Sequence, residues 1–184
     1  MPRLRLTIIA AASACAAPLY AQAPPEQVIN VPGFADFLAV DGSTVWATND
    51  GRVERWSRRG RMAQVPMAKP CGAMTIAHRS LWVADCKEGA LHRIDIRSAR
   101  KLAAIPTGIA NPKGELNVVA GAGSIWVASD DKGVVSRVDP ATNRVSATIT
   151  VSPGTHYLAF GYGSVWAVSS KAQTVQTEPY PNAR

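Results

Sequence analysis

A short motif, in which a Ser is followed by one or two residues and then Trp, recurs four times along this chain. Its tryptophans stand 36, 44 and 40 residues apart, and short runs between them alternate apolar and polar side chains in the manner of strands. A period near 40 residues is typical of architectures in which each repeat packs on the next. The repeated tryptophans are Trp46, Trp82, Trp126 and Trp166.

The repeats also agree downstream of the Trp. Three of them carry an apolar-x-Arg-apolar run, at 53–56, 91–94 and 135–138, and in the third repeat a polar turn at 139–143 leads into an alternating run at 145–149. Four short strands in about 40 residues describe one blade of a β-propeller. We therefore expect an all-β chain of four-stranded antiparallel blades, with the repeated Trp packed between neighbouring blades.

The propeller is expected over residues 24–184, with blades at roughly 34–67, 71–107, 115–151 and 155–184. The last repeat lacks a fourth strand, whereas residues 28–31 resemble the last strand of a repeat and are expected to act as the outer strand of the final blade. Two readings follow. The chain closes as a four-bladed ring, or it is an open arc from a longer, seven-bladed propeller. The irregular C-terminal repeat favours the arc.

Residues 1–23 have the features of a secretory signal peptide. Arg3 and Arg5 precede an apolar stretch at 6–17, and Ala21-Gln22-Ala23 resembles a small-x-small cleavage site. The apolar stretch is too short for a stable membrane span. A lipoprotein signal ending at Cys15 is a less favoured alternative, because the large apolar residue usual before such a Cys is missing. The sequence thus predicts a periplasmic or secreted protein.

Export to an oxidising compartment makes the two remaining cysteines informative. A two-residue turn at 78–79 sets Ile76 opposite Leu81, and counting outward sets Cys71 opposite Cys86. The distance between the Cβ atoms of two directly opposed residues is close to the distance that a disulfide requires. We predict a Cys71–Cys86 disulfide; the alternatives are two free thiols or a metal-binding pair.

The chain has 20 basic and 13 acidic residues, for a formal net charge of +7. Its densest basic cluster, at 52–61, falls on the expected outer strands of the first blade. We interpret the cluster either as an anion-binding site or as an ordinary solvent-exposed charged surface, and we prefer the second interpretation. Nucleic acid is not an expected partner of an exported protein.

The strings at 121–128, 136–145 and 147–151 resemble the YVTN-type seven-bladed propeller superfamily, and within it exported bacterial proteins of the virginiamycin B lyase-like (streptogramin lyase-like) type. The resemblance covers about residues 28–176. It implies a propeller and, for the lyase itself, magnesium-dependent elimination with a general-base His. That enzyme's repeats carry Glu shortly after the Trp, whereas here the Trp is followed by Ala or Val. The resemblance therefore implies the fold but not the chemistry.

In a propeller, the loops leading into each innermost strand and the loops joining the second and third strands share one side, which we call the channel face. The third lead-in loop, 108–114, makes its repeat the longest, and long loops on one face often carry binding. The candidate ligand-binding residues are Lys113, Glu115, Asn117, His156 and Tyr157. The alternative is a solvated loop beside a few polar channel residues.

His156 is either a base or metal ligand or, the preferred reading, a hydrogen-bonded structural residue. The other histidines are expected in a hairpin turn (His78) and at an exposed strand position (His92), so neither is placed to share a metal with it. No catalytic residue, metal ligand or cofactor is assigned.

The favoured function is a non-enzymatic binding or scaffold module that recognises a small molecule, a peptide or an envelope partner. The alternative is a magnesium-dependent lyase of the streptogramin lyase type. The chain is expected to be monomeric if the ring is complete and to associate through exposed edges if it is not.

Overall fold

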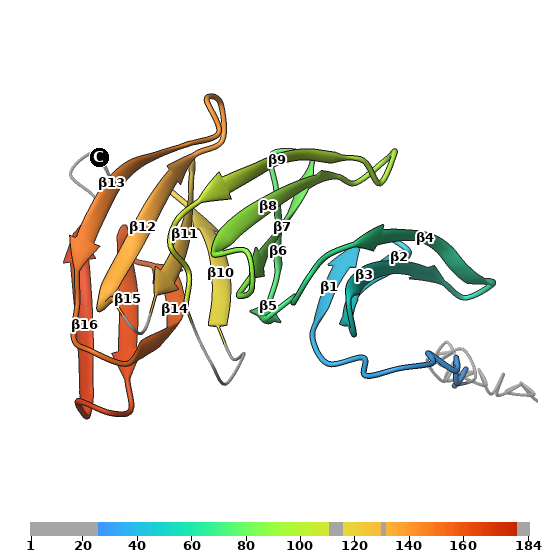
Figure 1. The fold of residues 1–184 in the computed structure, drawn as a ribbon, viewed down its shortest axis with the longest axis horizontal. Helices are drawn as coiled ribbons and strands as arrows, with labels where there is room; N and C mark the ends of the chain where they lie inside the picture. The colour runs from blue at the N-terminus through green and yellow to red at the C-terminus, as the bar shows by residue number, and fades with distance from the viewer. Residues whose placement is uncertain (1–25, 111–115, 130–131, 180–184) are drawn as a thin grey trace, which may run out of the picture.

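The computed structural model describes residues 26–110, 116–129 and 132–179, and within them the regular elements are all β-strands. Four antiparallel sheets follow one another along the chain and stand side by side in an arc (Figure 1). The first and last sheets lie at opposite ends of this arc, so the described residues form a partial propeller, as the repeats predict.

Each blade is a meander in which successive strands pair. Blade one consists of β1 (Leu38–Asp41), β2 (Thr44–Asn49), β3 (Arg52–Ser57) and β4 (Gly60–Pro66). Blade two consists of β6 (Thr75–Ala77), β7 (Ser80–Asp85), β8 (Ala90–Asp95) and β9 (Lys101–Pro106). Blade three consists of β10 (Leu116–Gly121), β11 (Ser124–Ser129), β12 (Val134–Asp139) and β13 (Arg144–Thr150), with the short β5 (Gly72–Ala73) added parallel to β10. Blade four has three strands, β14 (Thr155–Gly161), β15 (Ser164–Ser169) and β16 (Thr174–Pro179).

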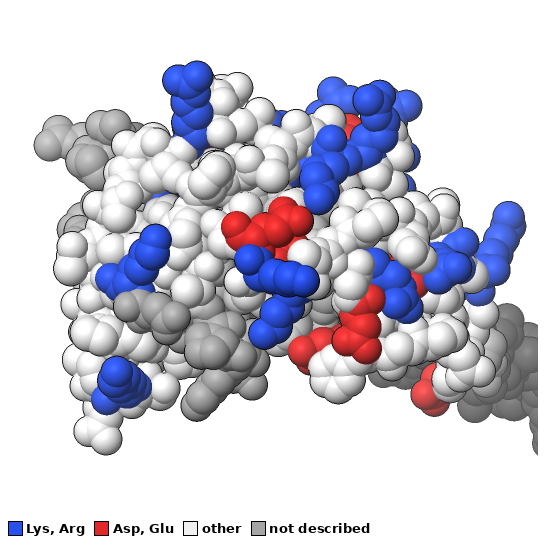
Figure 2. Space-filling view, in the orientation of Figure 1, with Lys and Arg blue, Asp and Glu red and all other residues white. Residues whose placement is uncertain are grey.

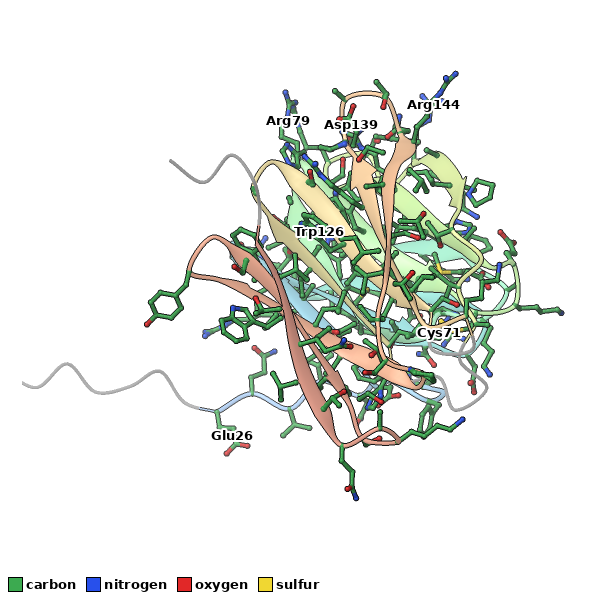
Figure 3. All side chains as sticks on the ribbon, turned by 90° about the vertical axis from the view of Figure 1, so that its left-hand side faces the viewer. Glu26, Cys71, Arg79, Trp126, Asp139 and Arg144 are labelled. Atoms are coloured by element: carbon green, nitrogen blue, oxygen red, sulfur yellow. A yellow bond between two sulfur atoms is a disulfide. The ribbon has the colours of Figure 1, made fainter. Side chains whose placement is uncertain are left out.

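The second strand of each blade has two different faces. The face that carries the repeated Trp, which we call the rear face, points to the next blade. The opposite, front face carries an aliphatic residue and points to the preceding blade. The rear face of blade one and the front face of blade two share one core cluster that contains Trp46, Val53, Leu81 and Ile94. A larger cluster continues through blades two, three and four. Trp46, Trp82 and Trp126 are buried between blades, as predicted, and Figure 3 shows Trp126 inside the stack. Trp166 departs from the prediction and is 39% exposed, because no blade packs on its side of blade four in the described residues.

The repeated Arg on the third strand ties blade one to blade two and blade two to blade three. The guanidinium of Arg93 lies 5.0 Å from the Trp82 ring centroid, and its Nε donates to Ser80 Oγ at 2.8 Å. Its Nη1 reaches the β12–β13 turn of blade three and donates to the carbonyl oxygen of Pro140 at 2.6 Å. Arg55 makes the same connection from blade one to Ile96 O in blade two, at 2.6 Å. In blade four, Thr177 stands opposite Trp166 where the other blades have this Arg.

The predicted disulfide between Cys71 and Cys86 is confirmed, with Cα atoms 5.8 Å apart, but the register used to predict it is wrong. Ile76 does pair with Leu81, yet further along the strand Cys71 N donates to Ala84 O and Cys86 N to Lys69 O. The two cysteines are therefore diagonal rather than directly opposed.

The slip arises because the inner strand of blade two breaks after Ala73, and Gly72–Ala73 turns to pair with β10 of blade three. Gly72 has a φ of 105° and approaches the Leu116 backbone so closely that a Cβ would collide with it.

The expectation that residues 28–31 form the outer strand of the last blade is also wrong. Residues 26–32 form no strand and lie against blade one, where Gln27 Nε2 donates to Arg58 O at 2.7 Å. Ile29 lines a hollow on the front face of that blade together with Val40, Trp56 and Met62. Since blades one and four stand at opposite ends of the arc, this segment cannot reach blade four of its own chain.

Candidate functional site

A buried polar residue ends the second strand of every blade and holds the segment that leads into the same blade. Asn49 Oδ1 accepts from Phe34 N at 2.7 Å, and Ser129 Oγ donates to Gly108 O at 2.9 Å. Ser169 Oγ likewise donates to Pro153 O at 2.7 Å. These bonds fix the backbone of the channel face, so side chains on it are carried by anchored loops.

Asp85 is the strongest of these anchors. Its buried carboxylate accepts backbone N–H bonds from Ala68 and Lys69 on the lead-in side, and from Lys87 and Glu88 in the following loop. A carboxylate that receives four backbone donors holds both loops rigidly, because hydrogen bonds to a charged group are stronger than neutral ones. The disulfide, one residue further on, closes the same corner.

Between blades one and two, these anchored loops surround a hollow of about 310 Å³. Its walls are the lead-in segments of the two blades and the β2–β3 loop, with Thr48 and Asn49 at its base. Asp36 N donates to Thr48 O, and Phe37 N donates to Thr48 Oγ1 at 2.9 Å, so the blade-one wall is also held by its backbone. The lining residues are Phe34, Asp36, Thr48, Asn49, Asp50, Gly51, Ala68, Lys69 and Pro70.

The hollow carries charges of both signs. Asp36, Asp50 and Lys69 are exposed, and among the described residues no ion pair or hydrogen bond occupies their side-chain charges. Phe34, which is 65% exposed, adds an apolar surface at the same place. Two carboxylates, one ammonium and one aromatic ring on fixed loops suit a ligand that has its own paired charges.

Beneath one wall lies a buried carboxylate, Glu54, which accepts from Asn49 Nδ2 at 3.0 Å, Arg52 Nε at 2.9 Å and Arg61 Nη1 at 2.8 Å. Burial by itself would raise the pKa of Glu54, but these donors and the Trp56 indole outweigh it and lower the pKa from 4.5 to about 2. Part of the basic cluster at 52–61 therefore neutralises a buried acid rather than facing an external anion.

A second polar group lies at the β7–β8 loop. Asp85, Glu88 and His92 bring ligand atoms within 4.8 Å of one another, the one such group of three found in the described part of the chain. The prediction that His92 is exposed is wrong, because the structure buries it fully. Alternation along the strand indicated an outward position, but blade one covers this face of blade two. Burial, reinforced by the charge of Lys101, lowers the pKa of His92, so its ring is neutral near pH 7.

The chemistry of this group fits a loop anchor better than a metal centre. The Asp85 oxygens already accept four backbone N–H bonds, which leaves little capacity for a cation. His92 Nε2 lies 2.9 Å from Glu88 Oε2 but outside good hydrogen-bond alignment, and Glu88 is largely exposed. The two remaining groups, one of them exposed at the surface, are fewer ligands than a structural zinc site uses.

Of the five candidate residues taken from sequence, Lys113 and Glu115 lie outside the described residues. Asn117 uses its whole amide between blades: Nδ2 donates to Leu158 O and Oδ1 accepts from Leu158 N, both at 2.5 Å. His156 Nδ1 lies 2.9 Å from Gly154 O, and its ring meets Tyr157 edge-on at 5.1 Å between centroids. The structure thus brings Asn117 to the strand that carries His156 and Tyr157, but it engages the amide in blade packing.

The hollow between blades one and two was not singled out from the sequence, although Asp36, Asp50 and Lys69 are all on the expected channel face. In the sequence, the long loop at 108–114 is the more conspicuous feature of that face. Two features of the sequence together indicate the hollow. Opposite charges lie on two consecutive lead-in segments, and in each of these blades a polar residue, Asn49 or Asp85, ends the second strand and holds the lead-in segment.

The class of molecule defined by this fold is a partial β-propeller with a charged hollow on its channel face. No family model matches the chain, and no curated protein matches it. Among solved structures, it is similar to BamB from Moraxella catarrhalis, with a TM-score of 0.69 and 16% identity over 85% of this chain and 50% of that one.

Two further likenesses support the same fold. A catalytically inactive virginiamycin B lyase from Staphylococcus aureus, solved with quinupristin, gives a TM-score of 0.61 at 13% identity over 85% of this chain and 59% of that one. The computationally designed protein Ika4 gives 0.68 at 12% identity over 83% of this chain and 95% of that one. At these identities the likeness shows the propeller fold alone, and the chain spans between half and three-fifths of the two natural proteins.

The residues predicted to be a signal peptide, 1–23, lie outside the described part of the chain. Within the described part, no helix is long and apolar enough to cross a membrane. The disulfide is consistent with an oxidising, exported environment.

Proposed function

We propose that this chain is an exported β-propeller binding module that recognises a small zwitterion or the charged end of a peptide in the hollow between blades one and two. The observation that carries the proposal is the set of exposed charges, Asp36, Asp50 and Lys69, that stand on backbone-anchored loops around a hollow of about 310 Å³. A ligand ammonium would meet the two carboxylates, and a ligand carboxylate would meet the Lys69 ammonium.

Rigid walls support recognition without catalysis. Because Asn49, Thr48 and Asp85 hold the two loops through the backbone, little ordering is required when a ligand binds, and more of the contact energy appears as affinity. Figure 2 shows basic and acidic side chains interspersed on the visible face, without one large patch of a single sign. A surface of this kind favours small mixed-charge ligands over anionic polymers.

The test is isothermal titration of the full chain with glycylglycine and with longer zwitterionic peptides. We expect Lys69→Gln and Asp50→Asn each to weaken binding about tenfold, since each removes one charged contact worth about 1.4 kcal/mol. Lys171→Gln, which removes a similar charge from the last blade, is the matched control and is expected to bind as the parent does. Equal binding by all four proteins would refute the assignment of the hollow.

The magnesium-dependent lyase stays an alternative prediction. Its distinguishing test is turnover of a cyclic depsipeptide that requires added magnesium and disappears in His156→Ala. Since the described contacts of His156 are to the Gly154 carbonyl and the Tyr157 ring, we favour the binding module.

A further inference from the structure

Each blade has turns at the end of its strands opposite the channel face, and we call this end of the molecule the turn face. Because successive strands are antiparallel, the turn after the first strand and the turn after the third strand both lie there. Within blade two, Ile96 N donates to Arg79 O at 3.4 Å. Across the two blades, Arg93 donates to His78 O at 3.4 Å and to Pro140 O at 2.6 Å. The turn face of blades two and three is therefore one continuous surface.

Every fully exposed charge on the turn face of blades two and three is basic, and we call these residues the turn-face cations. None of their side chains makes a hydrogen bond or an ion pair with another described residue. Both blades have a neighbouring blade on each side in this chain, so this exposure does not arise from an open end of the arc. Figure 3 shows Arg79 and Arg144 directed outward at the end of the molecule away from Cys71. The turn-face cations are Arg79 in the β6–β7 turn, Arg97 and Arg100 in the β8–β9 turn, Lys101 at the start of β9 and Arg144 at the start of β13.

The two acidic residues of the same surface are half-buried and turned towards the backbone. Asp95 Oδ1 accepts from Ser98 N at 2.7 Å, and Asp139 Oδ1 accepts from Ala141 N at 2.8 Å. The pKa of Asp95 is lowered mainly by the Ser98 backbone N–H, with a smaller contribution from the charge of Arg79. These carboxylates hold the turns to which they belong, so the outer surface keeps an excess of positive charge.

The positive charge is spread over the surface instead of converging on one hollow. The turn-face cations come from three turns on two blades, and none of them lines the hollows at blade one or on the channel face. Their neighbours in the turns, among them Ser98, Ala141 and Thr142, have short side chains, so the long basic side chains extend furthest from the backbone. A guanidinium pairs with phosphate oxygens through two parallel hydrogen bonds. This arrangement fits an extended surface of phosphate groups better than one small anion.

We propose that the turn face of blades two and three binds the surface of a membrane that contains anionic phospholipids. Each turn-face cation lies near lipid phosphates, and a Lys or Arg at an anionic leaflet contributes roughly a fivefold gain in partitioning. An exported chain, which the N-terminal sequence predicts, meets such a membrane in the cell envelope. In this orientation the hollow on the channel face points away from the membrane, so the proposal does not rest on the ligand proposed for that hollow.

The test is co-sedimentation of the purified chain, expressed for export, with vesicles made of equal parts of phosphatidylglycerol and phosphatidylcholine. At about 0.1 M salt we expect the chain to sediment with these vesicles and not with vesicles of phosphatidylcholine alone. At about 1 M salt the chain should be released, because the Debye length falls from about 10 Å to about 3 Å.

Three substitutions, one in each turn, assign the binding to this face. Arg79→Gln, Arg97→Gln and Arg144→Gln together should lower the partition coefficient about a hundredfold, because three contributions of roughly fivefold are lost. All three side chains are exposed, so the triple variant is expected to stay folded.

The matched control removes the same charge from loops of the channel face, by Lys87→Gln with Lys132→Gln and Lys171→Gln. Those loops lie one strand length away from the turn face. A strand of six residues such as β8 is about 20 Å long, twice the Debye length of about 10 Å, so the control should lose less than about threefold in partitioning.

Thermal melting checks that both triple variants stay folded. If the first does not, Arg97→Gln with Arg144→Gln replaces it, with an expected loss of about 25-fold. Failure of the parent to sediment with anionic vesicles, sedimentation with phosphatidylcholine alone, or equal losses in the two triple variants would each overturn the proposal. If the parent binds soluble polyglutamate but not vesicles, and the first variant loses that binding, the turn face binds an acidic protein and the membrane assignment is wrong.

Discussion

The link between blades two and three by Arg93 gives the sharpest prediction about stability. Its guanidinium stacks on Trp82, donates from Nε to Ser80 Oγ, and donates from Nη1 to Pro140 O and to Asn143 Oδ1 at 2.9 Å. Arg93→Met keeps much of the aliphatic volume but removes all four interactions. Each hydrogen bond to a partly buried charged group contributes about 1 kcal/mol net, and the stacking about 0.5–1 kcal/mol.

We therefore expect Arg93→Met to lower the free energy of unfolding by about 3.5–4 kcal/mol, measured by urea denaturation at constant m-value. Arg97→Met changes an exposed Arg in the nearby β8–β9 turn and should change stability by less than about 0.5 kcal/mol. A double-mutant cycle with Asn143→Ala should give a coupling of about 1 kcal/mol. If Arg93→Met and Arg97→Met are equally stable, or the coupling is zero, the blade-to-blade role of Arg93 is wrong.

Two further predictions concern buried groups. Because the folded-state pKa of Glu54 is about 2, below its usual 4.5, its stabilisation is present above pH 4.5 and is lost as the pH falls towards 2. Glu54→Gln should thus cost about 3 kcal/mol at pH 7, and the difference from the parent in urea denaturation should shrink towards pH 2; a difference independent of pH would contradict the assigned pKa. Removing the disulfide by Cys71→Ser with Cys86→Ser should cost about 3 kcal/mol, from a cross-link between residues 15 apart in sequence. Reductant should destabilise the parent but leave this variant unchanged, and a parent insensitive to full reduction would refute the estimate.

Features that depend on a few neighbouring residues can be predicted from this sequence, whereas those that depend on contacts between distant segments cannot. The four-stranded blades follow from period-two alternation and turn chemistry, which act over a few residues. The predicted Cys71–Cys86 disulfide is present although the predicted strand register is wrong. A disulfide can form over a range of Cα separations, whereas the pairing of two strands fixes one register. The placement of His92 failed, because burial on a blade face depends on the neighbouring blade and not on alternation within one strand.

By itself, the sequence determined the all-β repeat, the positions of the second and third strands, and the packing of Trp46, Trp82 and Trp126 between blades. Only the tertiary structure decided which side of the channel face is hollowed, that Asn49 and Asp85 anchor it, and that residues 26–32 rest on blade one. These features arise from contacts between segments distant in sequence, and repeat periodicity carries no information about how far the blades turn around their axis.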